Sequence, residues 1–182
     1  MAITLETARL VLRPLGRGDL ADLLALDRDP EVMRYVGSPA GVKSPAETEQ
    51  RARARIEESL RGDHEPLGFW RVEGRDDGIF LGVAALLRMP EDGDVEVAYR
   101  LVRAAWGRGI ATEAAGALIV HGLRTLGLPR LVAVTYPENR ASQRVLDKLG
   151  FERRGLTEYK GVQTTFHVLT REAWSAPAGR RD

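Results

Sequence analysis

The sequence has 182 residues and a formal net charge of +1, from 27 lysines and arginines against 26 aspartates and glutamates. This length suits one folded domain, and 43% hydrophobic with 29% charged residues is typical of a globular protein. The lack of cysteine excludes a disulfide framework, and with only three histidines it argues against a metal site. The near-neutral charge argues against nucleic-acid binding, and no apolar run approaches the ~20 residues of a membrane helix. Without a visible secretory signal, we expect a cytoplasmic protein that does not bind a membrane.

The first half of the chain predicts strands and helices in alternation. Residues 9–14 alternate apolar and polar side chains, as in a strand with one buried face. Three helix-start signals follow, an N-capping residue alone or with proline directly after it: Asp19, Asp29-Pro30 and Ser44-Pro45. Glu47 completes a capping box, and its helix should run to about Leu60. The apolar stretches 67–72 and 79–87 are typical of two further strands.

The second half contains one predicted parallel unit, which begins with the alternating strand 95–102. We expect the remaining elements in this order: a glycine-rich turn at 106–112, a helix at 113–126, a strand at 131–135, a helix at 139–149 and strands near 151–159 and 164–169. The strand–helix–strand succession predicts parallel pairing with a right-handed crossover. Because no linker or repeat divides the chain, we expect a single mixed α/β domain over 1–182, with a core at about 8–174 and a flexible tail at 175–182.

The glycine-rich turn, WGRGIAT at 106–112, lies between a predicted strand and a predicted helix. Gly107 and Gly109 allow tight backbone turns and leave amide groups accessible to a ligand. The start of a helix adds unpaired amide donors and the positive end of the helix dipole, which favour a phosphate or pyrophosphate. Two glycines alone more often form only a turn, but the arginines nearby favour the anion site. A P-loop and a dinucleotide fold are poor matches, because GxxxxGK[ST] is missing and Thr112 replaces the third glycine of GxGxxG.

A second motif begins 33 positions after Trp106 and reads N-x-x-S-x-R-V-x-x-K-x-G-F. By itself this motif is well explained by the capping of a helix at its two ends. Asn139 suits the N-cap, Ser142 the third helical position, and Gly150 the left-handed residue beyond the helix end. Together with the glycine-rich turn, however, the motif is distinctive.

These two motifs resemble the GNAT superfamily of acyl-CoA-dependent N-acyltransferases, whose pyrophosphate loop reads Arg/Gln-x-x-Gly-x-Gly/Ala. This chain reads Trp106-x-x-Gly109-x-Ala111, with tryptophan in place of Arg or Gln. The Rim-type branch, which acetylates ribosomal-protein N-termini, shares that replacement. The branch is also similar in ARLxLRPL…D…L…DPxVxRYV near the N-terminus and in the asparagine-serine motif. The resemblance covers roughly Ala8 to Trp174.

The resemblance implies a mixed α/β fold with a mostly antiparallel sheet of about seven strands, flanked by helices. A central parallel pair, 95–102 and 131–136, would splay apart to hold acetyl-CoA. The pantetheine arm would pair with the backbone of Leu101 and Val102, and Asn139 would contact the arm near the thioester. Backbone amides of the loop would hold the pyrophosphate: Trp106, Gly107, Arg108, Gly109, Ile110, Ala111 and Thr112. No metal is implied.

The implied reaction transfers an acetyl group to a primary amine by direct attack in a ternary complex. Glu96 is the candidate general base, acting through water, because it lies on the predicted strand at the opening and matches the acidic position of Rim-type enzymes. Many GNAT enzymes carry a general-acid tyrosine where this chain has Leu146. Ser142 is the replacement that fits the family, as a hydrogen-bond donor to the leaving sulfur. Tyr136 and Tyr159 are reserve candidates for the same role.

The acceptor is an amine, either a protein N-terminal α-amine or a small molecule, and the sequence does not distinguish them. Three aromatic residues are candidates to line its pocket: Tyr35, Phe69 and Trp70. The branch often forms homodimers, and the sequence leaves the oligomeric state open.

Two other functions compete with catalysis. A catalytically idle acyl-CoA-binding regulatory domain is supported only by the leucine at 146, and Glu96 with Ser142 speaks against it. Nucleic-acid binding through Arg51, Arg53 and Arg55 is a weaker hypothesis. Glutamates share that predicted helix, so a solvated charged face explains the arginines better.

Overall fold

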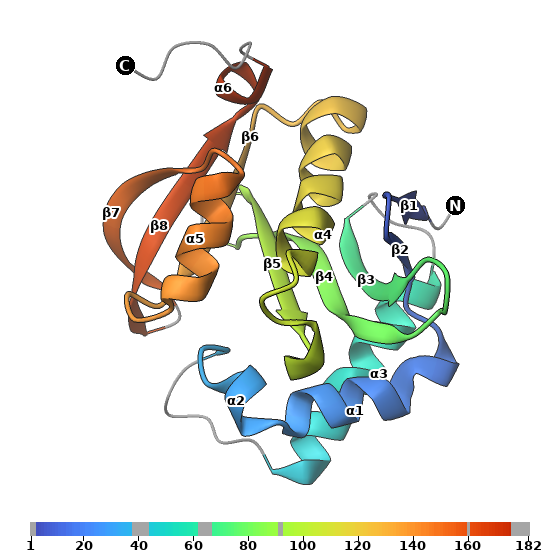
Figure 1. Cartoon of the computed structure of the whole chain (residues 1–182). Coiled ribbons are helices and arrows are strands. Elements are labelled where there is room, and N and C mark those ends of the chain that lie inside the picture. The colour runs from blue at the N-terminus through green and yellow to red at the C-terminus, as the bar shows by residue number, and fades with distance from the viewer. Residues whose placement is uncertain (1–2, 38–43, 62–66, 91–92, 160, 176–182) are drawn as a thin grey trace.

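The computed structural model of the chain describes residues 3–37, 44–61, 67–90, 93–159 and 161–175. Its strands form one eight-stranded sheet in the order β1-β2-β3-β4-β5-β6-β8-β7 (Figure 1). Neighbouring strands pair antiparallel, except for β5 and β6, which run parallel. The expected mixed α/β fold, with helices flanking a mostly antiparallel sheet and one parallel pair, is therefore confirmed.

The strands are β1 (Leu5–Glu6), β2 (Leu10–Pro14), β3 (Gly68–Gly74), β4 (Phe80–Arg88), β5 (Val95–Leu101), β6 (Arg130–Thr135), β7 (Glu152–Tyr159) and β8 (Val162–Thr170). The helices of the described residues are α1 (Leu20–Arg28), α2 (Pro30–Met33), α3 (Pro45–Arg61), α4 (Ile110–Ile119), α5 (Arg140–Lys148) and α6 (Arg171–Ser175). Two 3-10 turns, η1 (Arg17–Asp19) and η2 (Arg103–Ala105), and one π-helical turn, η3 (Val120–Thr125), connect them.

Three elements differ from the sequence-based expectation. β1 is too short to leave an alternating pattern, and it brings the strand number to eight rather than about seven. α6 was not expected either. α4 begins at Ile110 rather than Glu113, because Gly109 turns in the left-handed region directly before it. Of the expected tail, residues 176–182 lie outside the described part of the chain. No helix among the described residues has the length and apolarity to cross a membrane.

The two faces of the sheet bury different clusters of side chains. On one face, α4 places Ile110, Ala114 and Leu118 against odd-numbered residues of β5, including Val95 and Val97. On the other face, α1 and α3 form a second core with β4. Alternation points the odd-numbered side chains of β5 into the first core, whereas Glu96, Ala98 and Arg100 on its other face are half-buried.

The parallel strands β5 and β6 touch at one point and then part. Within the described residues, their pairing is recorded at a single bridge between Glu96 and Val132. From Val97 onward β5 remains paired with β4 as far as Leu101, while β6 remains paired with β8. Because β5 stays paired with β4 and β6 stays paired with β8, the two parallel strands diverge. Backbone groups of β5 then face an opening between β5 and β6.

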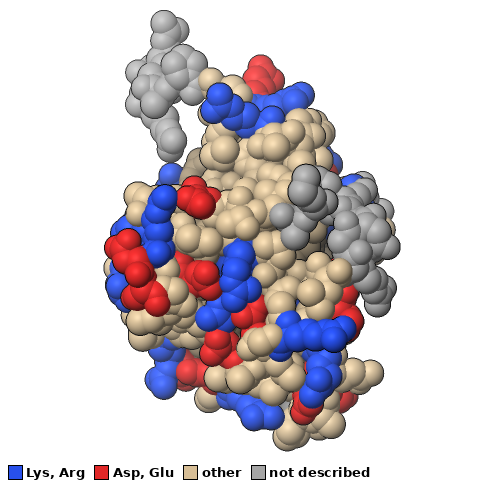
Figure 2. Space-filling view, turned by 90° about the vertical axis from the view of Figure 1, so that its right-hand side faces the viewer, with Lys and Arg blue, Asp and Glu red and all other residues tan. Residues whose placement is uncertain are grey.

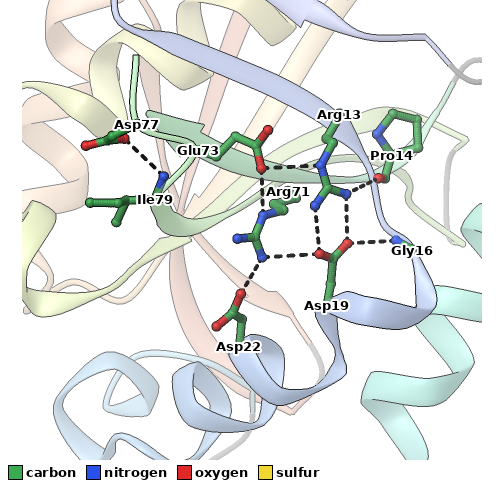
Figure 3. Close-up of polar contacts among 9 residues, drawn as sticks. All are labelled: Arg13, Pro14, Gly16, Asp19, Asp22, Arg71, Glu73, Asp77 and Ile79. Atoms are coloured by element: carbon green, nitrogen blue, oxygen red, sulfur yellow. Dashed lines mark hydrogen bonds and ion pairs between the residues drawn. The ribbon is translucent and has the colours of Figure 1, made fainter. Parts of the chain in front are cut away.

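A buried ion cluster joins β2, β3 and the start of α1 (Figure 3). Asp19 is 3% exposed, and its carboxylate accepts hydrogen bonds from both Nη atoms of Arg13 at 2.8 and 2.9 Å. It also accepts from the Gly16 amide at 2.7 Å and from Nη1 of Arg71 at 3.2 Å. Glu73 accepts Nε of both arginines. The expected capping role of Asp19 is wrong, because its carboxylate makes no side-chain cap bond to α1. The R-P-x-x-x-x-D spacing instead supplies a partly buried guanidinium–carboxylate pair between Arg13 and Asp19.

The buried His167 on β8 should make the free energy of unfolding depend on pH. The side chain is 0% exposed, its Nε2 contacts the Thr135 hydroxyl at 3.1 Å, and its Nδ1 has no hydrogen-bond partner in the part of the chain that the structure describes. Burial and the charge of Arg153, partly offset by Asp147, lower the pKa of His167. Protonation therefore favours the unfolded chain, and the free energy of unfolding should fall as pH drops below about 6.5, the ordinary histidine pKa.

The measurement is chemical denaturation between pH 5 and 8 for the wild type and His167→Gln. The variant should lose part of the pH dependence over this range, because glutamine does not titrate. Parallel curves for the two proteins would show that His167 is not the group responsible.

Candidate functional site

The glycine-rich turn folds into an anion-binding geometry at the start of α4. Gly107 and Gly109 have φ values of 71° and 77°, in the left-handed region that glycine adopts without a steric penalty. Gly109 is the N-cap of α4 and provides no side-chain cap. The first amides of α4, from Ile110 to Thr112, therefore have neither an intrahelical acceptor nor a capping side chain. These donors and the helix dipole favour a negatively charged group.

Arg9, near the N-terminus, forms hydrogen bonds with this loop and with the first turn of α4. Arg9 donates from Nη1 to the carbonyl of Arg108 at 3.0 Å and from Nε to Glu113 Oε2 at 2.6 Å. Oε1 of Glu113 accepts the Arg9 amide and the Thr7 hydroxyl. Burial opposes ionisation of Glu113, but these hydrogen bonds outweigh it and lower its pKa. The acidic side chain in the first turn of α4 is thus turned toward the N-terminal segment, which keeps it paired.

Leu101 and Val102, the two residues expected to pair with the pantetheine arm, differ in their backbone hydrogen bonds. The Val102 amide donates to Leu81 at 3.0 Å and its carbonyl accepts from Ala105 at 2.9 Å, so both backbone groups already have partners. In an antiparallel ladder, this bond means that the amide and carbonyl of Leu101 point away from β4, toward the opening. The indole Nε1 of Trp106 donates to that carbonyl at 2.9 Å. The backbone geometry favours Leu101 over Val102 as the residue that meets a ligand in the opening.

The start of α5 faces the same opening from the side of β6. Asn139 acts as N-cap, accepting the Ser142 amide at 3.1 Å. The Ser142 hydroxyl lies 2.9 Å from the hydroxyl of Tyr99 on β5, a residue that sequence reasoning missed. Burial, only partly offset by this hydrogen bond, raises the pKa of Tyr99 to about 12. A tyrosine on an otherwise apolar strand face is a usable signal, because its buried hydroxyl needs a partner.

Leu146, which the resemblance aligns with the general-acid tyrosine of many GNAT enzymes, contributes to the core. Leu146 is 1% exposed and packs in the cluster beneath α4. The Tyr99–Ser142 pair is the hydroxyl pair that the structure brings to the start of α5.

Glu96 lies on the opposite face of β5, at the point where β5 and β6 part. Its Oε2 accepts the hydroxyl of Tyr159 at 3.3 Å. Tyr159 comes from the end of β7 and packs with Phe166 against a small buried cluster that includes Val132. The structure therefore brings the candidate base and one of the reserve tyrosines together, although 63 positions separate them.

Tyr136, the other reserve tyrosine, lies at the end of β6 and contacts the segment after α2. Its ring packs against Tyr35 with centroids 5.8 Å apart, and its hydroxyl donates to the Gly37 carbonyl. These contacts place the α2 segment beside the open end of the strand pair.

The other two aromatic pocket candidates lie elsewhere. Trp70 is 4% exposed, donates to the Ile3 carbonyl at 2.8 Å and packs edge-on to His121, so the expectation that it lines an acceptor pocket is wrong. Phe69 packs on the other face, 5.2 Å from the guanidinium of Arg55. Alternation on β3 separates the two neighbours, so only one of them could have faced any given site.

The arginines of α3 do not form a free basic face. Arg53 pairs with Glu49 at 2.7 Å, as a solvated helix surface predicts. Arg55 departs from that expectation, since its side chain is 19% exposed and pairs with the buried Asp27 at 2.8 Å. On the face shown in Figure 2, basic and acidic side chains are interspersed, which is not the single-sign surface of a nucleic-acid-binding protein.

The known proteins that this chain resembles, by sequence and by structure, are acetyltransferases. A family model described as an acetyltransferase (GNAT) domain matches residues 9–152. The uncharacterized N-acetyltransferase YoaA of Bacillus subtilis (strain 168) is 30% identical over 154 residues, 84% of each chain. The acetyltransferase from Agrobacterium tumefaciens superposes with a TM-score of 0.77 at 25% identity, covering 92% of this chain and 94% of that one. RimL, a ribosomal-protein alpha-N-acetyltransferase in complex with coenzyme A, shares the fold with a TM-score of 0.75 at 20% identity, over 94% and 99% of the two chains.

Proposed function

Because this chain belongs to the acetyltransferase (GNAT) family, we propose that it transfers the acetyl group of acetyl-CoA to a primary amine by direct attack in a ternary complex. The observation that carries the proposal is the opening between β5 and β6, with the start of α4 at its end. A thioester held there would meet side chains from both faces of β5. The RimL-like fold and the Rim-type motifs favour an α-amine or another weakly basic amine as acceptor.

Acetyl-CoA fits the donors that this opening provides. The Trp106 amide already donates to the Arg103 carbonyl at 3.0 Å, so the expectation that it holds the pyrophosphate is wrong. The two negative charges of the pyrophosphate match the remaining backbone amides over 107–112, and the amide-rich pantetheine arm can pair with Leu101. Asn139 uses its side-chain carbonyl for the N-cap, so its Nδ2 is the atom that would donate to the arm. The cosubstrate would lie along the edge of β5 that β6 leaves unpaired.

Glu96 is the proposed general base. As the amine nitrogen bonds to the thioester carbonyl carbon, the C–S bond breaks and the amine loses a proton. A carboxylate at the point of divergence, hydrogen-bonded to Tyr159 at 3.3 Å, is placed to receive that proton through water. An α-amine with a pKa of about 7.8 is neutral far more often at pH 7 than a lysine side chain with a pKa of about 10.4, so it needs less assistance.

Ser142 is the proposed donor to the leaving sulfur. Tyr99 remains neutral at physiological pH, because burial holds its pKa near 12, and it can donate a hydrogen bond to the Ser142 oxygen. Ser142 could then direct its own hydrogen toward the thiolate as negative charge develops there. In this arrangement Tyr99 positions Ser142, and the proton that finally resides on sulfur is exchanged with solvent.

Glu96→Gln should lower kcat/KM for amine acetylation by about 10²–10⁴-fold and leave a measurable residual rate, because positioning of the two substrates is retained. Thiol release from acetyl-CoA over pH 6–9, with a panel of primary amines, measures the effect. Glu152→Gln, which alters an exposed carboxylate on β7, is the matched control and should leave the rate unchanged.

Full activity of Glu96→Gln at every pH would remove Glu96 from the mechanism. Acetyl-CoA binding by the wild type without thiol release for any amine would instead favour the idle regulatory domain.

A further inference from the structure

A nearly buried guanidinium lies on the same face of β5 as Glu96. Arg100 follows Glu96 by four positions, so both side chains leave the same face, roughly 13 Å apart at Cα for an extended strand. The Arg100 side chain is 10% exposed. Its Nη1 donates to Asp27 at 2.6 Å and lies 3.5 Å from the Met33 sulfur, so it is held against α1 and the end of α2.

The cluster around Arg100 carries more positive than negative charge. Asp27, 4% exposed, also pairs with Arg55 at 2.8 Å, so two guanidinium groups share one carboxylate. Burial and the neighbouring charge of Arg55, partly offset by Asp27, lower the pKa of Arg100 to about 10, and the side chain remains charged at neutral pH. Charged side chains at such depth are ordinarily balanced by partners, and among the described residues two guanidinium groups here pair with one carboxylate.

Arg100 also has unused donors. A guanidinium carries five N–H groups, and the contacts recorded among the described residues use Nη1 alone. Nε and one Nη2 hydrogen form the side-on pair that accepts a carboxylate bidentately. Met33 leads into the segment where Tyr35 and Gly37 contact Tyr136 at the end of β6, so the cluster around Arg100 adjoins this segment, and Arg100 belongs to the face of β5 that carries Glu96.

We propose that Arg100 binds a carboxylate of the acceptor. The acceptor is then an amine that carries a carboxylate several bonds from the nitrogen, as in a short peptide. The amine would lie toward Glu96 and the carboxylate toward Arg100, with the small side chain of Ala98 between them on this face. This inference rests on the proposed function, because Glu96 defines the amine end.

The test compares triglycine with triglycine amide at pH 8.5, where a large share of both amines is neutral and Arg100 is still charged. The wild type should acetylate triglycine with a kcat/KM roughly tenfold to a hundredfold higher, the range expected for a hydrogen bond between charged groups. Arg100→Gln should remove this preference, so that its kcat/KM values for triglycine and triglycine amide become equal. Arg100→Lys should restore part of it.

Equal rates of the wild type with both peptides would overturn the inference, whereas thiol release with neither peptide nor any other amine would count against the proposed function. If Arg100→Gln does not fold, product inhibition of the wild type provides the answer. N-acetyl-triglycine should then inhibit at least about tenfold more strongly than its amide, and equal inhibition would overturn the inference.

Discussion

Gly109→Asp should weaken acetyl-CoA binding at least about 100-fold, equivalent to about 2.7 kcal/mol. The new carboxylate would lie at the N-cap of α4, next to the amides proposed to hold the pyrophosphate. There it would repel the two phosphate charges and compete for the same donors, and each hydrogen bond lost to a charged group costs about 1.5–3 kcal/mol. Isothermal titration with acetyl-CoA measures the loss directly.

Gly109→Asn is the control, because it has the same size and tolerates the left-handed backbone about as well, but adds no charge. Its affinity should fall less than about tenfold. The nearest neighbour of a Cβ at this position is Arg9 Nη2 at 3.5 Å, so neither side chain meets a steric clash at its base. Equal losses in both variants would indicate a steric effect, and no loss in Gly109→Asp would exclude the loop as the pyrophosphate site.

Asp19→Asn should lower the free energy of unfolding by about 3–5 kcal/mol, the cost of removing one partner from a buried ion pair. Arg13 and Arg71 would both lose the carboxylate of Asp19, which would leave Arg13 with Glu73, and Arg71 with Glu73 and Asp22. Chemical denaturation measures the change. Glu49→Gln removes an exposed pair with Arg53 on α3 and should cost no more than about 0.5 kcal/mol.

The same carboxylate predicts how this difference depends on pH. Burial alone would raise the pKa of Asp19, but hydrogen bonds from Arg13 and the Gly16 amide, with the charges of Arg13 and Arg71, outweigh it and lower the pKa. The stabilisation is therefore present above the unfolded pKa of about 3.9 and is lost as pH falls through the folded value. The gap between wild type and Asp19→Asn should narrow below pH 4. A gap that stays constant to pH 3 would show that ionised Asp19 is not its source.

Features set by short-range rules could be predicted from the sequence. Ser44 and Glu47 form the expected capping box of α3, with bonds of 2.7–3.2 Å, because only three positions separate them. Gly107 and Gly109 adopt the expected left-handed turn at the start of α4. The order of strands and helices followed from alternation and capping, and it led to the parallel pair that forms the opening.

Side-chain partners far apart in the chain could not be predicted in this way. Alternation assigned Tyr99 and Glu96 to opposite faces of β5, but it could not tell that Ser142 would meet one and Tyr159 the other. Those pairings depend on the register of β7 in the sheet and on how α5 packs beside β5. Neither can be read from the local sequence.

The same limit explains why the roles of Asp19 and Arg55 were predicted wrongly. Asp19 and Arg55 have the local context of a helix cap and a solvated helix face, and local context was the only information that the sequence offered about them. The fold places Arg13 and Arg71 next to Asp19 and the buried Asp27 next to Arg55, with the last pair 28 positions apart in the chain. Local sequence therefore determined the glycine-rich turn before α4 and most of the succession of strands and helices along the chain of this acetyltransferase. Only the tertiary structure decided which charges became buried partners, because burial depends on the elements that pack above a residue and not on its neighbours in the chain.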